Sequence, residues 1–192
     1  MPYLGYDPRM NGIDIEIRHG RTADVFAIGR ILVETWRVAF RGLLADDFLD
    51  RMSPAEQAVR HMGRRSAPGV QYYVAVDRRT GEVVGFVNFG GSRAKAPVHV
   101  SEIYALYVRP AYQGFGIGGR LVRAAARRVA SGGAHSLFAW VLSTNPNRAF
   151  YEHLGAVIAQ TGRIGIGGRS YEQVSYVWHD LEALLADGAG AV

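Results

Sequence analysis

The stretch YQGFGIGGR, residues 112–120, joins a predicted strand to a predicted helix. It consists of Tyr112, Gln113, Gly114, Phe115, Gly116, Ile117, Gly118, Gly119 and Arg120. Glycine adopts positive φ without strain and has no Cβ, so successive N–H groups can converge on an anion at the positive end of a helix dipole. We therefore predict that this segment binds a phosphate or pyrophosphate. The competing interpretation is a glycine-rich turn that only begins a helix.

Two well-known phosphate-binding motifs do not fit this segment. Gly114, Gly116 and Gly119 satisfy the dinucleotide fingerprint G-x-G-x-x-G, which directly follows a first strand and has an acidic residue about 20 residues further on. Here the motif lies past the middle of the chain, and residues 131–140 contain neither Asp nor Glu. A Walker A loop is excluded too, because the chain contains no Gly-Lys-Ser/Thr sequence.

On both sides of the glycine segment, hydrophobic periodicity predicts alternating strands and helices. Strands are expected at 13–17, 71–77, 82–89, 98–108, 137–142, 156–164 and 171–178. Helices are expected from 22 to 42, from Ser53, from 116 to 130 and from 148 to 154. This order predicts a mixed α/β sheet in a single domain over 13–181, with loose termini at 1–12 and 186–192.

Composition restricts the class of protein and of site. The chain has 192 residues, 48% of them apolar, and no cysteine, which excludes thiolate nucleophiles and iron–sulfur clusters. No apolar run has the length of a membrane span or a secretory signal, so we expect a cytoplasmic protein without a membrane partner. No pair of histidines has metal-ligand spacing, and no metal is expected.

The net charge of +5 comes almost entirely from arginine, since Lys95 is the single lysine. Arginine forks suit phosphate groups, although a modest excess of cations is also typical of a solvated surface. The arginines are dispersed and the aromatic–basic interleaving of nucleic-acid modules is missing, so no nucleic-acid partner is expected.

Two motifs at a consistent separation resemble the GNAT superfamily of N-acetyltransferases. EIYALYV followed by RPAYQGFGIGGRLV is similar to the central motif of that family, whose pyrophosphate loop Arg/Gln-x-x-Gly-x-Gly/Ala is matched by Gln113, Gly116 and Gly118. NPNRAFYEHLG, residues 145–155, resembles a later motif in which an Asn precedes a short helix bearing Phe-Tyr-Glu. Ala156 departs from the family, which usually has an aromatic residue there.

The resemblance, which covers about residues 13–181, implies an acyl-CoA-binding fold. Its central mixed, mostly antiparallel sheet is flanked by helices and splayed in the middle. Acetyl-CoA would be the cosubstrate, with its pantetheine arm on the backbone of Leu106, Tyr107 and Val108 and its pyrophosphate on the segment from Gln113 to Arg120.

The resemblance also implies roles for individual side chains. Tyr151 matches the family's general acid and would also contact the cofactor. Asn145 matches a position that hydrogen-bonds pantetheine or an ordered water. The alternative for Asn145 is that it only forms a turn. Glu102 is the candidate general base, provided that an unbulged strand puts it on one face with Tyr104 and Leu106; the alternative is a solvated strand end. His99 is a second candidate, as a proton relay.

Trp36 and Phe40 are expected to line the amine pocket, although Trp36 at helical spacing also suits the core. The predicted reaction transfers an acetyl group from acetyl-CoA to an amine of a small molecule, peptide or protein by direct attack. The alternative is a noncatalytic acyl-CoA sensor or regulatory domain. The sequence does not specify the oligomeric state, for which a homodimer is one candidate.

Overall fold

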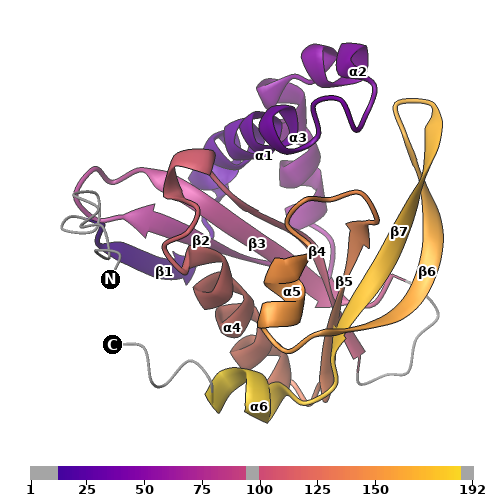
Figure 1. The fold of residues 1–192 in the computed structure, drawn as a ribbon. Helices are drawn as coiled ribbons and strands as arrows, with labels where there is room; N and C mark the ends of the chain where they lie inside the picture. The colour runs from indigo at the N-terminus through magenta and orange to yellow at the C-terminus, as the bar shows by residue number, and fades with distance from the viewer. Residues whose placement is uncertain (1–12, 94–99, 187–192) are drawn as a thin grey trace, which may run out of the picture.

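The computed structural model describes residues 13–93 and 100–186 (Figure 1). Most of the termini predicted to be loose, and His99, lie outside the described residues. The exception at the C-terminal end is Ala186, the last residue of a helix.

Seven strands form one sheet in the order β1-β2-β3-β4-β5-β7-β6. They are β1 (Ile15–His19), β2 (Gln71–Asp77), β3 (Val83–Gly91), β4 (Val100–Val108), β5 (Ser136–Leu142), β6 (Val157–Ile166) and β7 (Arg169–Trp178). The pairing of β4 with β5 is parallel, and every other pair of neighbouring strands is antiparallel. The predicted mixed, mostly antiparallel sheet is confirmed.

Helices cover both faces of the sheet (Figure 1). They are η2 (Thr22–Asp24), α1 (Val25–Ala39), α2 (Asp46–Arg51), α3 (Pro54–Arg65), η3 (Pro110–Tyr112), α4 (Ile117–Ala130), α5 (Ala149–His153) and α6 (Leu181–Ala186). One buried cluster joins α4 and α6 to the sheet, and a second joins α1 to the opposite face. Because Leu181 and Leu184 belong to the first cluster, the packed chain continues past the expected domain end at residue 181.

The long helices begin and pack as their sequences predict. Ser53 caps α3, because its side-chain oxygen accepts a hydrogen bond from the Glu56 N–H at 3.3 Å, and Pro54 takes the first helical position. α1 and α3 pack closely at Gly29, where a Cβ would lie only 2.3 Å from the Pro54 carbonyl oxygen. We infer that the glycine allows the α1–α3 layer to form.

The sheet opens in its centre, where β4 and β5 separate. The two strands pair only between Val100–Ile103 and Ser136–Ala139, and both then continue without pairing to each other. This separation leaves the backbone of β4 after Ile103 without a strand partner on the side that faces β5. The expected splay is confirmed.

A β-bulge at Tyr104 accompanies the splay. The register with β3 shifts there, because Asn88 faces Ala105 while the next residue, Phe89, faces Ile103. The alternation of faces along β4 therefore changes at the bulge, and Ile103 and Leu106 both contact the α4 side. The expectation that Glu102, Tyr104 and Leu106 share one face is wrong.

A buried histidine on α3 makes the stability of the fold depend on pH. His61 is 1% exposed, and its Nδ1 lies 2.9 Å from the Tyr72 hydroxyl. Burial lowers the pKa of His61 from 6.5 to about 4, with a smaller contribution from Arg64. Between pH 6.5 and about pH 4, His61 binds a proton in the unfolded chain but not in the folded chain. Protonation therefore favours the unfolded chain, and the free energy of unfolding decreases as the pH falls.

We predict that the free energy of unfolding decreases by about 2–3 kcal/mol from pH 7.5 to pH 4.5 through His61 alone. The measurement is urea denaturation at both pH values for the wild type and for His61→Gln, which does not titrate. The wild type should lose more stability than the variant by that amount. Equal losses in the two proteins would contradict the assignment.

Candidate active site

A cavity of about 350 Å³ lies where β4 and β5 separate. Its size falls in the range of small-molecule sites. Most residues predicted to bind the cofactor line it, namely Leu106, Tyr107, Val108, Gln113, Gly114, Gly116, Ile117, Gly118, Gly119, Asn145 and Tyr151. The structure thus brings the glycine segment, the open part of β4 and the start of α5 to one cavity.

The glycine segment leaves the N-terminus of α4 open to an anion. Gly114 and Gly116 have φ of 84° and 70°, and a methyl group at either position would meet no other atom within 4 Å. Gly116 is the N-cap of α4, so no side chain caps the helix, and its first turn contains no acidic residue. Unpaired N–H groups at such a terminus favour a phosphate.

Two further contacts fix the glycine segment. A Cβ at Gly118 would lie 3.0 Å from the ring of Phe150, so glycine lets α4 approach α5 closely at the cavity wall. The Gln113 side-chain amide donates a hydrogen bond of 2.9 Å to the Val108 carbonyl and thereby attaches the segment to the end of β4. These contacts preorganise the segment before any ligand binds.

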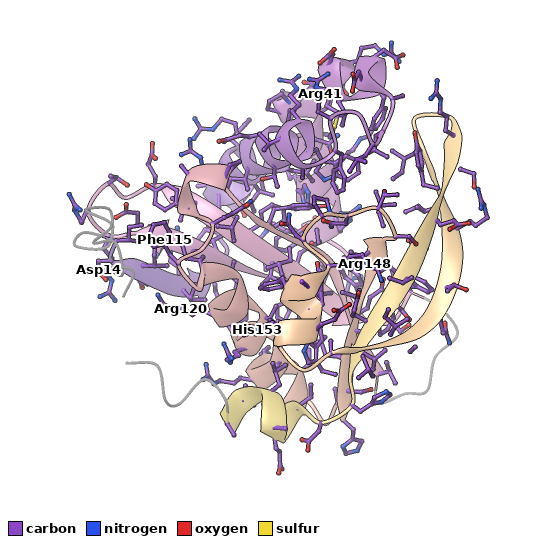
Figure 2. All side chains as sticks on the ribbon, in the orientation of Figure 1. Asp14, Arg41, Phe115, Arg120, Arg148 and His153 are labelled. Atoms are coloured by element: carbon purple, nitrogen blue, oxygen red, sulfur yellow. The ribbon has the colours of Figure 1, made fainter. Side chains whose placement is uncertain are left out.

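Phe115 and Arg120, both expected at the cofactor, are not among the residues that line the cavity. Phe115 packs against the core cluster beneath α4, and the Arg120 guanidinium donates a hydrogen bond of 2.7 Å to the Ile15 carbonyl of β1. Figure 2 shows both side chains near β1. In this structure Arg120 attaches α4 to the edge strand.

Tyr151 stands on α5 and lines the cavity. Its ring stacks on Tyr176 with centroids 5.2 Å apart and meets Phe150 edge to face at 5.1 Å. Tyr176 is itself fixed, because its hydroxyl donates to Glu152 at 2.6 Å and accepts from Arg148 at 3.0 Å. This aromatic stack holds the phenol in one orientation.

Burial raises the pKa of Tyr151, and the phenols of Tyr107 and Tyr176 raise it further. Desolvation disfavours the phenolate, so Tyr151 keeps its proton at neutral pH. Burial also raises the pKa of Tyr107, whose side chain lines the same cavity. The site therefore presents protonated hydroxyl groups.

A second cavity of about 240 Å³ adjoins the first, and we call it the acceptor cavity. The two cavities share the lining residues Phe40, Leu106, Tyr107, Asn145 and Tyr151. Trp36 lines the acceptor cavity and also packs against the second core cluster. A molecule in the acceptor cavity would meet a ligand of the first cavity beside Tyr151.

Asn145 forms a turn at the junction of the cavities. Its side-chain oxygen accepts a hydrogen bond of 2.8 Å from the Asn147 N–H, and its own N–H donates to the Leu142 carbonyl. The turn is the alternative that sequence analysis left open for this residue, and it also places Asn145 on the wall of both cavities.

Glu102 is not part of either cavity lining, although its ion-pair partner Arg93 lines the second cavity. Its side chain is 2% exposed, and one carboxylate oxygen accepts hydrogen bonds from the Nε and Nη2 atoms of Arg93. The other oxygen accepts from the Arg93 backbone N–H at 2.9 Å. The carboxylate is therefore engaged in an ion pair rather than directed at a ligand.

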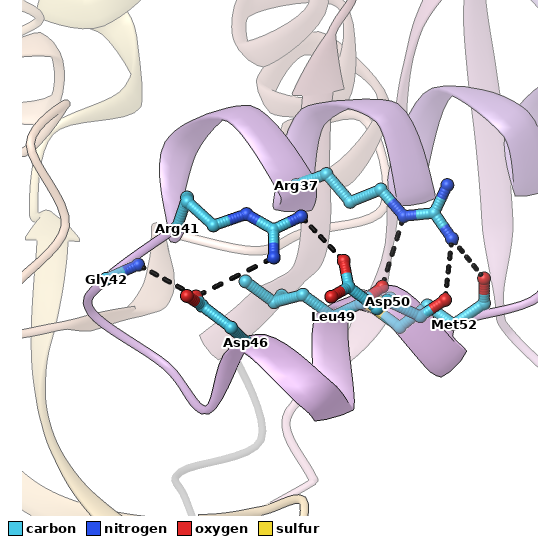
Figure 3. Close-up of polar contacts among 7 residues, drawn as sticks. All are labelled: Arg37, Arg41, Gly42, Asp46, Leu49, Asp50 and Met52. Atoms are coloured by element: carbon cyan, nitrogen blue, oxygen red, sulfur yellow. Dashed lines mark hydrogen bonds and ion pairs between the residues drawn. The ribbon is translucent and has the colours of Figure 1, made fainter.

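The end of α1 that lines both cavities is fixed by a polar clamp to α2 (Figure 3). Arg37 donates hydrogen bonds to the carbonyls of Leu49, Asp50 and Met52, at 3.0–3.1 Å. Arg41 adds an ion pair with Asp50 at 2.7 Å. These contacts satisfy carbonyls at the C-terminus of α2 and hold the chain that follows Phe40.

Some cavity residues were not predicted. Thr35, Tyr112, Asn147 and Phe150 line the first cavity. The Thr35 hydroxyl is buried without a hydrogen-bond partner among the described residues. Phe150 lies within the quoted motif and Tyr112 within the quoted segment, but Thr35 carries no signal beyond its place on a predicted helix.

Within the described residues, no group of three or more His, Asp or Glu side chains could hold a metal ion. In 13–93 and 100–186, none of the helices has the length and apolar content needed to cross a membrane.

Comparison with known proteins gives the family of this chain. The model of the Acetyltransferase (GNAT) family matches residues 29–156, and the chain belongs to that family. The chain is 29% identical over 170 residues to the uncharacterized N-acetyltransferase YuaI of Bacillus subtilis (strain 168), covering 88% of this chain and 96% of the relative.

Two solved structures share the fold. The PaiA N-acetyltransferase of Thermoplasma acidophilum, in complex with coenzyme A, is 18% identical with a TM-score of 0.65 and covers 84% of this chain and 98% of its own. YncA of Salmonella typhimurium, solved with its cofactor acetyl-CoA, is 23% identical with a TM-score of 0.65. The match covers 88% of this chain and 94% of the YncA chain.

Proposed function

We propose that the protein transfers an acetyl group from acetyl-CoA to the amine of a small molecule, peptide or protein. One observation carries the proposal: a single cavity joins the open N-terminus of α4, the unpaired backbone of β4 and the hydroxyl-bearing ring of Tyr151. The helix N-terminus suits a phosphate, the β4 backbone suits an extended chain, and Tyr151 is a proton donor. Together they suit a long thioester that carries phosphate groups.

The residues present fit acetyl-CoA in two ways. The Gly114–Gly119 backbone offers N–H groups and the helix dipole to a pyrophosphate. The backbone of Leu106–Val108 can pair with an extended pantetheine arm as a further strand would.

When bound, acetyl-CoA supplies the acetyl thioester. The backbone of β4 near Leu106 would polarise the thioester carbonyl, a form of oxyanion stabilisation. The amine nitrogen forms a bond to the carbonyl carbon while the carbon–sulfur bond breaks. Tyr151 donates its Oη proton to the departing sulfur, and the surplus amine proton passes to water, from which Tyr151 regains its own.

The high pKa of Tyr151 does not prevent this proton transfer. Burial disfavours a thiolate as it disfavours a phenolate, so the pKa values of donor and acceptor rise together in the cavity. We assign the removal of the amine proton to water rather than to Glu102, because both oxygens of that carboxylate already accept hydrogen bonds from Arg93.

The test is amine-dependent thiol release from acetyl-CoA, with the acetylated amine identified by mass spectrometry. We expect saturable release that requires both the protein and the amine. Acetyl-CoA binding without transfer to any amine would instead support the noncatalytic sensor, and the absence of binding would contradict both functions.

A further inference from the structure

The acceptor cavity is aromatic and contains no carboxylate. Six rings line it, those of Trp36, Phe40, Tyr104, Tyr107, Trp140 and Tyr151. Among the described residues that line it, Arg93 is the one charged residue, and none is Asp or Glu.

The charge of Arg93 is neutralised within the protein. Its guanidinium pairs with buried Glu102 and lies over the ring of Tyr104, 4.8 Å from the centroid. Because the pair has no net charge, the cavity gives no strong electrostatic attraction to a multiply charged ligand of either sign.

The backbone makes room for two of the rings. A Cβ at Gly90 would lie 2.6 Å from the Tyr104 hydroxyl oxygen, and that hydroxyl donates a hydrogen bond of 2.6 Å to the Gly91 carbonyl. A Cβ at Gly162 of β6 would lie 3.3 Å from the Trp140 ring. The positions of Tyr104 and Trp140 therefore depend on glycines of other strands in the sheet.

From these contacts we propose that the acceptor is an arylalkylamine, a monoamine whose aromatic body fills the acceptor cavity, and not a polyamine, an aminoglycoside or a lysine-rich peptide. The inference rests on the proposed function. Ring–ring contacts and the burial of apolar surface favour binding of a ligand with an aromatic ring. Additional ammonium groups would lose hydration without a carboxylate to pair with.

The absence of carboxylates also suits the chemistry. An ammonium is disfavoured in an uncharged, desolvated cavity, so the bound amine more readily takes the neutral form that attacks a carbonyl. A cavity that binds polycations needs acidic residues, and these residues would favour the unreactive ammonium form of the bound amine. Selectivity and reactivity thus point to the same class of acceptor.

The first experiment measures kcat/KM at saturating acetyl-CoA for three probes: 2-phenylethylamine, n-butylamine and spermidine. We expect 2-phenylethylamine to exceed n-butylamine by about 10- to 100-fold, the contribution of one buried ring. It should exceed spermidine by at least the same factor. Spermidine equal to or better than 2-phenylethylamine would overturn the proposal.

Two variants test the cavity directly. Trp140→Ala should reduce the preference for 2-phenylethylamine over n-butylamine at least about fivefold, because one wall of the ring site is lost. Gln173→Glu, a nearly isosteric change on β7 at the cavity wall, should raise kcat/KM for spermidine relative to 2-phenylethylamine about tenfold. Gln160→Glu on exposed β6 adds the same charge elsewhere and should leave this ratio unchanged.

The outcomes distinguish failure of the proposed acceptor class from failure of the proposed acetyltransferase function. Transfer to spermidine or n-butylamine with no preference for the aromatic probe would overturn the acceptor class and leave the acetyltransferase function standing. Unchanged probe ratios in both Trp140→Ala and Gln173→Glu would also overturn it. Acetyl-CoA binding without transfer to any probe or to a wider amine panel would overturn both.

Discussion

Replacing Tyr151 by Phe should lower kcat for amine acetylation by about 10²- to 10⁴-fold, the usual contribution of a general acid. The change removes only the hydroxyl, and the stack of the ring on Tyr176 and Phe150 is retained. Steady-state thiol release measures the loss. Because burial raises the pKa of Tyr151, its ionisation should cause no decline of the wild-type rate below about pH 9.

Tyr176→Phe is the matched control for this prediction. Tyr176 stacks on Tyr151, but its hydroxyl bonds to Glu152 and Arg148 and it lines neither cavity. Removing that hydroxyl should reduce kcat less than about tenfold, since it leaves the proton donor in place. Undiminished transfer by Tyr151→Phe, or equal losses in the two variants, would exclude Tyr151 as the acid.

A Gly116→Trp substitution should abolish acetyl-CoA binding. The residue has φ of 70° and faces open space at the N-terminus of α4, so an indole there would occupy the proposed pyrophosphate site. For a dissociation constant of about 10 μM, 1 mM acetyl-CoA stabilises the folded state by about 2.7 kcal/mol. This raises the Tm of the wild type by about 5 °C or more, and the variant should show no rise.

Gly81→Trp separates blocked binding from backbone strain. Gly81 also has a positive φ, of 73°, with nothing near a Cβ, but it lies in the β2–β3 turn away from the cavity lining. Both variants carry the strain of a bulky residue at positive φ, so both should melt below the wild type. Only Gly81→Trp should keep the acetyl-CoA-dependent rise, and a rise of wild-type size in Gly116→Trp would contradict the site.

The glycine segment and the order of elements were predictable because their signals are local. Gly114 and Gly116 adopt the positive φ values that their residue type favours, and Ser53 caps the helix that its sequence indicates. The splay of β4 and β5 was expected from the resemblance of 112–120 and 145–155 to a known family. Periodicity alone does not show where two parallel strands stop pairing.

The short helices α2 and α6 and the tertiary partners of several side chains were not predictable from the sequence. α2 and α6 have six residues each, too few to show a helical period, and they form because their apolar residues pack against longer helices. The bulge at Tyr104 and the pairing of Glu102 with Arg93 depend on contacts across the sheet. Phe115 and Arg120 similarly take partners in the core and on β1 instead of facing the cavity.

The most direct measurement is a calorimetric titration of acetyl-CoA into the folded wild-type protein, repeated with desulfo-CoA. The cavity that joins α4, β4 and Tyr151 predicts one site per chain with a dissociation constant in the micromolar range. Desulfo-CoA should bind to the same site, because the predicted contacts to pyrophosphate and pantetheine do not involve the sulfur. No detectable binding of either ligand by a demonstrably folded protein would contradict the account.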